Sequence, residues 1–163
     1  MLLFKTVKQL QTYLHNKRKT GLTIGYAPTM GALHQGHASL IKKAKAENDL
    51  SVCSIFVNPT QFNDPADLEK YPRTEEQDMT LLESLKNDVL FYPNIAEIYP
   101  DNLTIPTFDF GQIDKVMEGF HRPGHFEGVV QVVYRLIDIV EPCLLYTSPS
   151  PRDLSTSRMP SSA

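Results

Sequence analysis

Two apolar segments of the strand type enclose a loop and a helical segment early in this chain. The segments LTIGYA (residues 22–27) and LSVCSIFV (residues 50–57) are short and apolar, as buried strands are. Proline and glycine punctuate residues 28–36, and residues 37–48 carry apolar side chains at helical spacing. A strand, a crossover helix and a second strand favour folds built on a parallel sheet.

The same alternation continues on both sides of this unit. Residues 6–19 have apolar side chains at helical spacing, with Thr6 as a capping residue and Gly21 just past the end. A further helix is predicted to begin at Thr74, where acidic residues in the first turn suit the helix dipole. Residues 88–92 (DVLFY) predict a third strand.

The later part of the chain is less regular. Residues 93–110 are irregular with one short strand, and residues 126–140 (FEGVVQVVYRLIDIV) predict a long apolar helix or a helix–strand unit that ends before Pro142. We therefore predict an α/β fold with a doubly wound parallel sheet of the Rossmann-like type. Ligands of such folds bind beyond the carboxyl ends of the strands, where the polar loops of this chain begin.

Composition and charge exclude several functional classes. The 163 residues carry a formal net charge of -3, whereas nucleic-acid-binding proteins usually present a basic face. The apolar start of the chain is too short for a signal peptide, and no segment approaches the roughly 18 apolar residues of a membrane span. Cys53 and Cys143 have no metal-type or disulfide-type spacing, so we expect a reducing cytoplasm. Neither nucleic acid nor membrane is expected as a partner.

The segment PTMGALHQGH, from Pro28 to His37, carries the clearest chemical signal. It follows a strand and opens a helix, so its two imidazoles can lie together at the helix N-terminus, where exposed main-chain N–H groups attract anions. Gly31 and Gly36 permit close approach of a phosphate to the main chain. The pattern predicts a site for a phosphate-bearing substrate. The alternatives are ordinary surface histidines or a zinc site, which would need a third ligand at familiar spacing.

The H-x-G-H pattern in this position resembles the signature of the HIGH-type nucleotidyltransferase superfamily. Four blocks in order, PTMGALHQGHASL, SIFVNPTQF, YPRT and RPGHFEGV, make residues 1–142 similar to the pantothenate synthetase (pantoate–β-alanine ligase) family. The resemblance implies ATP-dependent condensation of (R)-pantoate with β-alanine through a pantoyl adenylate, giving pantothenate, AMP and pyrophosphate. It also implies a cytoplasmic homodimer that acts on small molecules and uses Mg2+ bound to ATP.

The resemblance also assigns roles to individual residues. His34 and His37 would meet the phosphates of ATP, with His37 as the proton donor. Asn58, Gln61 and Met30 would bind pantoate, and Gln61 would also bind β-alanine. An amide pair offers donors and acceptors to a hydroxy acid without adding charge, although loop capping is the alternative role for both amides. The whole segment that would contact ATP is Met30, Gly31, Ala32, Leu33, His34, Gln35, Gly36 and His37.

Three further residues match the family's blocks, each with an alternative interpretation. Tyr71 lies where the family has a loop over the site, or else forms a surface turn with the following proline. Arg122 would meet a phosphate, or else form a structural ion pair. Asp78 matches an acidic position near the family's magnesium site, but Gln77 replaces its acidic neighbour. Magnesium is therefore expected to be carried by ATP rather than bound directly by the protein.

The end of the sequence differs in character from the rest. Residues 143–163 are rich in serine and proline, which is typical of a disordered tail. Within them, CLLYTSPSPRD resembles the translation of a transposase-based sequencing adapter, and SRMPSSA resembles that of a flow-cell primer. We therefore expect residues 1–142 to form an incomplete nucleotide- and pantoate-binding domain, residues 143–163 to be disordered and non-native, and the family's C-terminal lid domain to be absent.

The resemblance has consequences for activity. The family continues past Pro142 with a G-E-K-D-type segment that completes the ATP site, so this chain alone is expected to have little or no ligase activity. Two alternatives remain open. One is a different HIGH-type nucleotidyltransferase, which would need basic residues for a second phosphate. The other is a nucleotide-binding module without catalysis.

Overall fold

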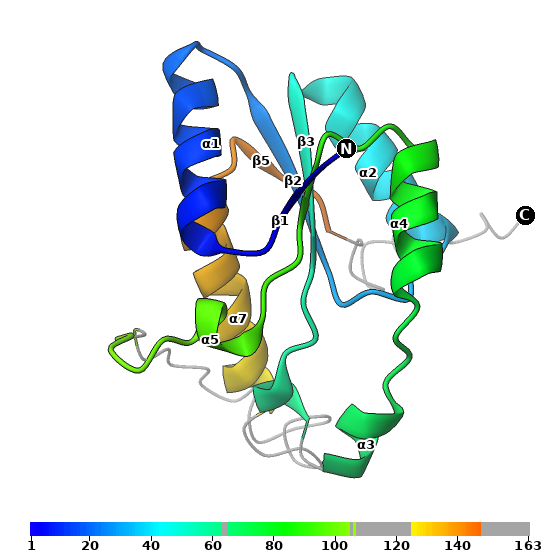
Figure 1. Cartoon of the computed structure of the whole chain (residues 1–163), viewed down its shortest axis with the longest axis vertical. Coiled ribbons are helices and arrows are strands. Elements are labelled where there is room, and N and C mark those ends of the chain that lie inside the picture. Colours follow the sequence, from blue (N-terminus) through cyan, green and yellow to red (C-terminus); the bar gives the residue numbers. More distant parts are fainter. Residues whose placement is uncertain (63–64, 105, 107–124, 148–163) are drawn as a thin grey trace, which may run out of the picture.

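The computed structural model describes residues 1–62, 65–104, 106 and 125–147, and within these ranges the strands form one parallel sheet with helices on both faces (Figure 1). The strands are β1 (Leu2–Phe4), β2 (Ile24–Thr29), β3 (Leu50–Ile55), β4 (Val89–Phe91) and β5 (Leu144–Leu145). The helices are α1 (Val7–Lys19), α2 (Gln35–Glu47), α3 (Pro65–Lys70), α4 (Glu75–Ser84), α5 (Ile95–Ile98) and α7 (His125–Val140), with a 3-10 turn, η1 (Pro59–Gln61).

The order of the strands identifies the type of sheet. Within the described ranges the order is β1-β4-β3-β2-β5, and every neighbouring pair is parallel. The chain winds from β2 to β3 to β4 in one direction and then returns to place β5 on the opposite side of β2. The winding therefore reverses at β2, which is the switch point where doubly wound folds bind their ligands. The predicted α/β fold is confirmed.

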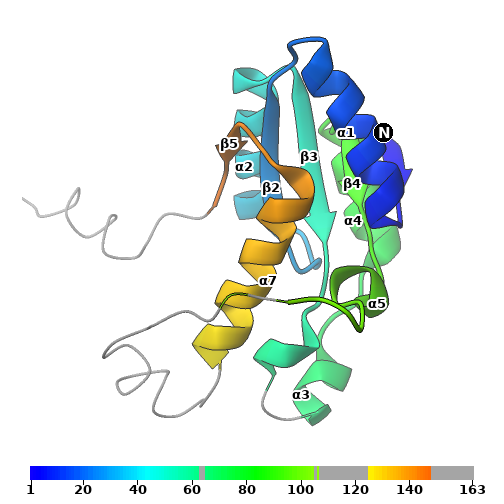
Figure 2. The same ribbon diagram turned by 90° about the vertical axis from the view of Figure 1, so that its left-hand side faces the viewer.

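Alternating side chains along the strands fill one core on each face of the sheet. Tyr26 and Val52 pack on the face covered by α1, α5 and α7, which Figure 2 turns toward the viewer. Ala27 and Cys53 pack on the opposite face, beneath α2 and α4. Cys53 is fully buried, as predicted for a core residue, and burial raises the pKa of its thiol to about 12.

The helix boundaries follow the capping residues predicted from the sequence. The Thr6 hydroxyl accepts a hydrogen bond from the N–H of Gln9 at the start of α1, and Gly21 adopts a φ of +81° after its end. Thr74 precedes α4, which has three acidic residues in its first turn. The predicted helix or helix–strand unit over residues 126–140 is a single helix, α7.

β2 extends two residues further than predicted, through Pro28 to Thr29. The carbonyl of Tyr26 accepts a hydrogen bond from the N–H of Tyr146 on the β5 side of β2, so Pro28, two residues on, faces the same side. In the described chain β5 ends at Leu145, opposite Tyr26, and does not reach Pro28. A proline without an N–H is tolerated there because β5 requires no donor from it.

The short elements β1, α3 and α5 were not predicted from the sequence. β1 pairs with β4, α3 lies within the polar loop after β3, and α5 replaces the irregular segment or short strand expected after residue 93. β1 and α5 are three and four residues long, so they offer too little sequence for a periodic pattern. β1 is stabilised by its pairing with β4, and α5 by its Asn94 cap and the burial of Ile98.

The structure also differs from the disorder predicted for residues 143–163 in the first part of that range. β5 forms there, and Tyr146 is buried, with its hydroxyl donating to Glu47 at 2.7 Å and accepting from Asn48 at 2.9 Å. The strand pairing needs only main-chain N–H and C=O groups, so a short apolar segment can extend the sheet at β2. Residues 148–163 lie outside the described residues.

None of the helices of the described chain combines the length and the apolar character that crossing a bilayer requires. Both cysteines are free thiols, Cys53 in the core and Cys143 at the surface.

Candidate functional site

The loop after β2 is held in a tight conformation at the carboxyl edge of the sheet. Gly31 has a φ of +83° and Ala32 a φ of +48°, so two successive residues adopt left-handed backbone conformations. A Cβ atom at Gly31 would lie 3.2 Å from both the Asp78 carboxylate and the Ile55 side chain. Glycine is therefore favoured at position 31 by its backbone, and a side chain there would also press on these two neighbours.

Asp78 anchors this loop to α4. Its carboxylate is buried and accepts hydrogen bonds from the main-chain N–H groups of Ala32 at 2.9 Å and Leu33 at 2.7 Å. The hydroxyl of Thr74 donates to the same carboxylate at 3.2 Å. The sequence interpretation placed Asp78 near a magnesium site, whereas both of its oxygens here bind the protein's own donors. Its evident role in this structure is to hold the segment that leads into the histidine pair.

His34 and His37 lie together at the start of α2, as the sequence predicted. Their ring centroids are 4.1 Å apart, and each ring caps the helix. Nδ1 of His34 accepts from the N–H of Gly36 at 3.1 Å, and Nδ1 of His37 accepts from the N–H of His34 at 3.3 Å. A neutral imidazole whose Nδ1 accepts carries its proton on Nε2. Both rings therefore present an Nε2–H donor close to the positive end of α2.

The environment of His37 favours its neutral form. Burial and the neighbouring His34 lower the pKa of His37 below its usual value of 6.5, although the Asp78 carboxylate acts in the opposite direction. Gly36 completes the arrangement, because a Cβ at this position would lie 2.8 Å from the His34 ring. Glycine between the two histidines thus allows the rings to fold over the helix start.

The two predicted amides lie at the turn η1, which follows β3: Asn58 caps it and Gln61 ends it. Gln61 donates a hydrogen bond from its side-chain nitrogen to the sulfur of Met30, so the turn after β3 meets the loop after β2. Asn58 is 1% exposed; its nitrogen donates to the carbonyl of Gly128 at 3.0 Å, and its oxygen accepts from the Tyr99 hydroxyl at 3.0 Å. The structure therefore joins Met30 and Gln61, and uses the Asn58 amide inside the protein.

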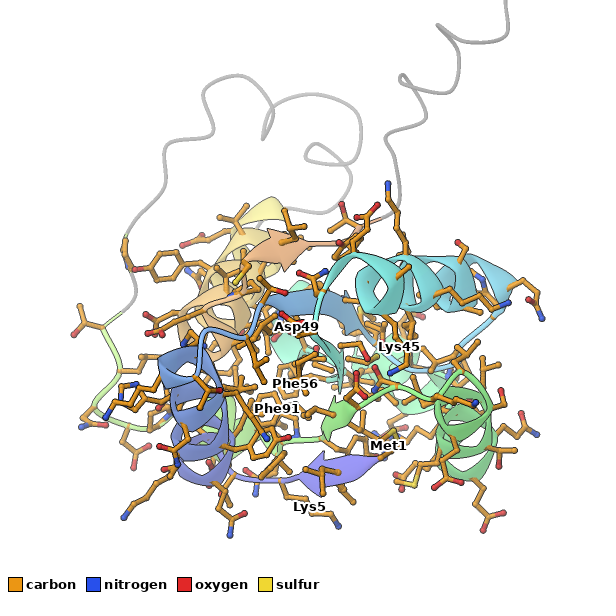
Figure 3. The ribbon with its side chains drawn as sticks, turned by 90° about the horizontal axis from the view of Figure 1, so that it is seen from above. Met1, Lys5, Lys45, Asp49, Phe56 and Phe91 are labelled. Carbon is orange, nitrogen blue, oxygen red and sulfur yellow. The ribbon has the colours of Figure 1, made fainter. Side chains whose placement is uncertain are left out.

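A cavity of about 450 Å³ opens beyond the carboxyl ends of β3 and β4. Met30, Gly31 and Asp78 line one part of it, and Lys5 lies at the opposite part, beside β1 at the outer edge of the sheet (Figure 3). The described residues that line the cavity do not include His34, His37 or Gln61. The cavity and the histidine pair are therefore neighbours that share the Met30–Gly31 loop, rather than one enclosed site.

Tyr92 and Glu75 mark the polar wall of this cavity. The Tyr92 hydroxyl donates a short hydrogen bond to the Glu75 carboxylate. Burial and this contact with Glu75 raise the pKa of Tyr92 to about 12, so the phenol stays protonated. Arg73 also lines the cavity and opposes this shift through its positive charge.

The remaining predicted residues have different outcomes. Tyr71 packs edge-on against Phe62, with ring centroids 5.6 Å apart, and lies next to the cavity residue Pro72. Arg122 lies outside the described residues. Gln35 is exposed in the first turn of α2. Among the residues that the structure describes, no group of three or more histidine, cysteine or acidic side chains could hold a metal ion.

Sequence reasoning missed two residues that shape the site. Tyr99 orients the Asn58 amide, and Gly128 contacts the turn η1 so closely that a Cβ at this position would lie 2.7 Å from the carbonyl oxygen of Thr60. Gly128 stands inside an apolar helical pattern, and an isolated glycine in such a pattern is the available signal of a close contact.

The sequence model of the pantoate-beta-alanine ligase family matches residues 2–148. The pantothenate synthetase of Phocaeicola vulgatus is 54% identical over 146 residues, which are 90% of this chain and 51% of that protein. The pantothenate synthetase of Porphyromonas gingivalis is 52% identical over 146 residues, which are 90% of this chain and 52% of that protein. The chain therefore spans about half the length of the curated relatives that it matches.

Solved structures agree with the sequence comparison. The pantoate-beta-alanine ligase of Francisella tularensis, in complex with beta-gamma ATP and beta-alanine, is 48% identical and superposes with a TM-score of 0.82 over 89% of this chain and 55% of that chain. The pantothenate synthetase of Thermus thermophilus is 40% identical, with a TM-score of 0.80 over 90% of this chain and 51% of that chain. The family match over most of the sequence and the shared fold show that the chain belongs to the pantoate–β-alanine ligase family.

Proposed function

We propose that this chain forms the nucleotide- and pantoate-binding part of an enzyme that condenses (R)-pantoate with β-alanine. In the first step the pantoate carboxylate attacks the α-phosphorus of ATP, giving pantoyl adenylate and releasing pyrophosphate. In the second step the amine of β-alanine attacks the acyl carbon and displaces AMP, which gives pantothenate. The names of the relatives and the ligands of the Francisella tularensis structure support this assignment.

The single observation that carries the proposal is the meeting of two loops at the carboxyl ends of β2 and β3, beside the switch point of the sheet. The loop after β2 leads into the histidine pair, and the turn after β3 carries Gln61, whose amide donates to Met30. A nucleotide on the first loop and a hydroxy acid on the second would therefore be adjacent. Such adjacency is what transfer between two bound substrates requires.

The histidine pair suits the phosphates of ATP. The Nε2–H groups of His34 and His37, together with the N-terminus of α2, would donate to phosphate oxygens and stabilise the charge of the leaving pyrophosphate. The lowered pKa of His37 keeps its imidazole neutral in the free protein near pH 7, where the Nε2–H group is a hydrogen-bond donor. Proton donation by His37 would use the protonated ring, which the negative charge of bound phosphates would favour. The Met30–His37 segment as a whole would contact the nucleotide.

Amides rather than charges would recognise pantoate. Gln61 and Met30 would contact pantoate directly, and Gln61 would also contact β-alanine. Asn58 would serve pantoate binding by fixing the turn, because its own amide already bonds with the protein. Tyr71 packs beside the residue that follows Gln61 and would cover this part of the site. Arg122 would contact a phosphate.

Three further features belong to the proposal. Mg2+ would enter with ATP, bound by the phosphates, because both oxygens of Asp78 already accept hydrogen bonds from main-chain N–H groups of the protein. The enzyme would work in the cytoplasm, where the free thiol of Cys53 is stable. It would act as a homodimer, as the sequence resemblance implies.

Complementation tests the proposal directly. The intact gene should restore growth of a pantothenate auxotroph without added pantothenate, and the His34→Ala and His37→Ala variants should not. The His15→Ala variant is the matched control, because His15 is an exposed histidine of α1 outside the site. Failure of the intact gene, with the protein detected in the cells, would reject ligase function. Growth with both site variants would reject the roles of the two histidines.

A further inference from the structure

We propose that Gly128 is a positioning residue for pantoate: by lacking a side chain, it lets α7 approach η1 and thereby fixes Gln61. The inference rests on the proposed function, because pantoate is the ligand whose binding would change. Gly128 lies four residues into the described α7 and is buried against the turn. Neither the histidine pair nor the cavity involves it directly.

The contact between α7 and η1 leaves no room for a methyl group. A Cβ at Gly128 would lie 2.7 Å from the carbonyl oxygen of Thr60 and 2.9 Å from its carbonyl carbon. Both are main-chain atoms, so rotation of a side chain cannot relieve the overlap. A larger residue would force the helix and the turn apart, since packed interiors do not absorb such overlaps without movement.

The Asn58 amide uses this close approach. Its nitrogen reaches the carbonyl of Gly128 at 3.0 Å, while its oxygen accepts from the Thr60 hydroxyl at 3.1 Å and the Tyr99 hydroxyl at 3.0 Å. One buried side chain thus joins the end of β3, the start of α7 and the segment after α5. Separating α7 from η1 would break the bond to Gly128 and leave a buried polar group unpaired.

Displacement at this contact would reach Gln61 through the turn. The N–H of Gln61 donates to the Asn58 carbonyl, and the Gln61 side chain donates to Met30. A turn this short moves as one unit, so a shift of Thr60 shifts the Gln61 amide that would contact pantoate. Misplacement of a binding group by about 1 Å can lower a reaction rate by on the order of 100-fold.

Helix propensity makes the test sharper. Glycine is less favourable than alanine inside a helix, so a role confined to the helix predicts that Gly128→Ala leaves substrate binding intact and stabilises α7. The proposal predicts instead that Gly128→Ala weakens the binding of pantoate. Glu127→Ala is the matched control, because Glu127 is exposed in the same turn and its carboxylate accepts a hydrogen bond from the Gln131 side chain.

The experiment measures steady-state kinetics of the intact protein. We expect Gly128→Ala to raise the KM for pantoate on the order of tenfold and to leave the KM for ATP within about twofold. Tyr99→Phe, which removes one donor to Asn58 without adding volume, should raise the KM for pantoate in the same direction by a smaller factor. Glu127→Ala should change neither. An unchanged KM for pantoate in a folded Gly128→Ala protein overturns the inference; if that variant does not fold, an unchanged KM in Tyr99→Phe does.

A second measurement separates this inference from the proposed function. Backbone amide NMR of the Gly128→Ala protein should show displaced Thr60 and Gln61 signals and an altered Asn58 side-chain amide, with Glu127→Ala as the reference. A wild-type protein without ligase activity would reject the function, but these signals would still test the contact. Signals that match the reference would reject the contact, whatever the activity.

Discussion

The carboxylate of Asp78, on α4, accepts a hydrogen bond of 2.7 Å from the main-chain N–H of Leu33, in the loop that ends at the histidine pair. The same carboxylate holds Ala32, whose positive φ is unfavourable for a residue with a side chain. The rest of the protein therefore maintains a strained loop through one buried acid. Pre-organisation of this kind would suit the proposed contact of the two imidazoles with a triphosphate.

Replacement of Asp78 should cost both stability and activity. Asp78→Ala leaves the Ala32 and Leu33 N–H groups without their charged acceptor, so the free energy of unfolding should fall by about 3 kcal/mol. Asp78→Asn keeps one acceptor oxygen, so its free energy of unfolding should fall by less. Denaturant unfolding measures both, with the exposed Glu76→Ala of the same helix as the control. A loss below about 0.5 kcal/mol in Asp78→Ala would contradict the anchoring role.

The lowered pKa of His37 predicts a pH dependence with a definite sign. A histidine whose pKa is lower in the folded than in the unfolded chain stabilises the fold above the unfolded value of 6.5, and this contribution is lost as the pH falls through the folded pKa. Imidazole proton NMR, assigned with His37→Gln, should give a pKa below 6.5 for the free protein. Added pyrophosphate should raise it, because an anion favours the charged ring. A free-protein pKa above the usual histidine value, or one insensitive to pyrophosphate, would count against the site.

Asp88 offers a test of stability that leaves the site intact. Burial raises the pKa of Asp88, but hydrogen bonds from Ser51 and the Lys45 ammonium at 2.9 Å outweigh it and lower the pKa below 3.8. Its stabilising effect is therefore present above pH 3.8 and is lost as the pH falls through the folded pKa.

Asp88→Asn should accordingly lower the free energy of unfolding by about 2 kcal/mol at pH 7 and by less in acid. Ligase kinetics should not change, because Asp88 lies at the amino end of β4, whereas the site lies at the carboxyl ends of the strands. Urea unfolding at both pH values measures the effect, and the exposed Asp101→Asn serves as the control. An equal loss at both pH values would show that the carboxylate charge is not the cause.

Local sequence signals predicted the elements that depend on neighbours in the chain. Thr6 and Gly21 bound α1 because capping is a matter of a few consecutive residues. The pairing of His34 with His37 follows from their spacing at a helix start. The predicted end of β2 was too early because Pro28 was taken as the start of a loop. Whether a proline can lie within this strand depends on where β5 ends and not on the sequence of β2.

Contacts between distant residues could not be predicted in this way. Asp78 lies 45 residues after Leu33, and Gly128 lies 70 residues after Asn58. β1 forms because Leu2 pairs with Val89 in β4. A strand of three residues is too short for its sequence pattern to indicate which strand it pairs with. The family's blocks indicated that these segments belong to one site, but only the fold shows which atoms bond.

The 163-residue chain expressed alone should have little or no ligase activity. It spans about half the length of its curated relatives, and the resemblance places further ATP- and pantoate-binding residues beyond the shared region. An assay for AMP formation with ATP, pantoate and β-alanine should give a rate at background level, and the intact gene product is the positive control. Near-normal turnover by this chain alone would refute the expectation.

Exchange of labelled pyrophosphate into ATP by the intact protein tests the central claim most directly, because it isolates the adenylation step at the histidine pair. The account predicts exchange that requires pantoate and falls by on the order of 100-fold or more in His34→Ala and His37→Ala, with His15→Ala unchanged. Exchange that proceeds without pantoate, or at the wild-type rate in both histidine variants, would contradict it.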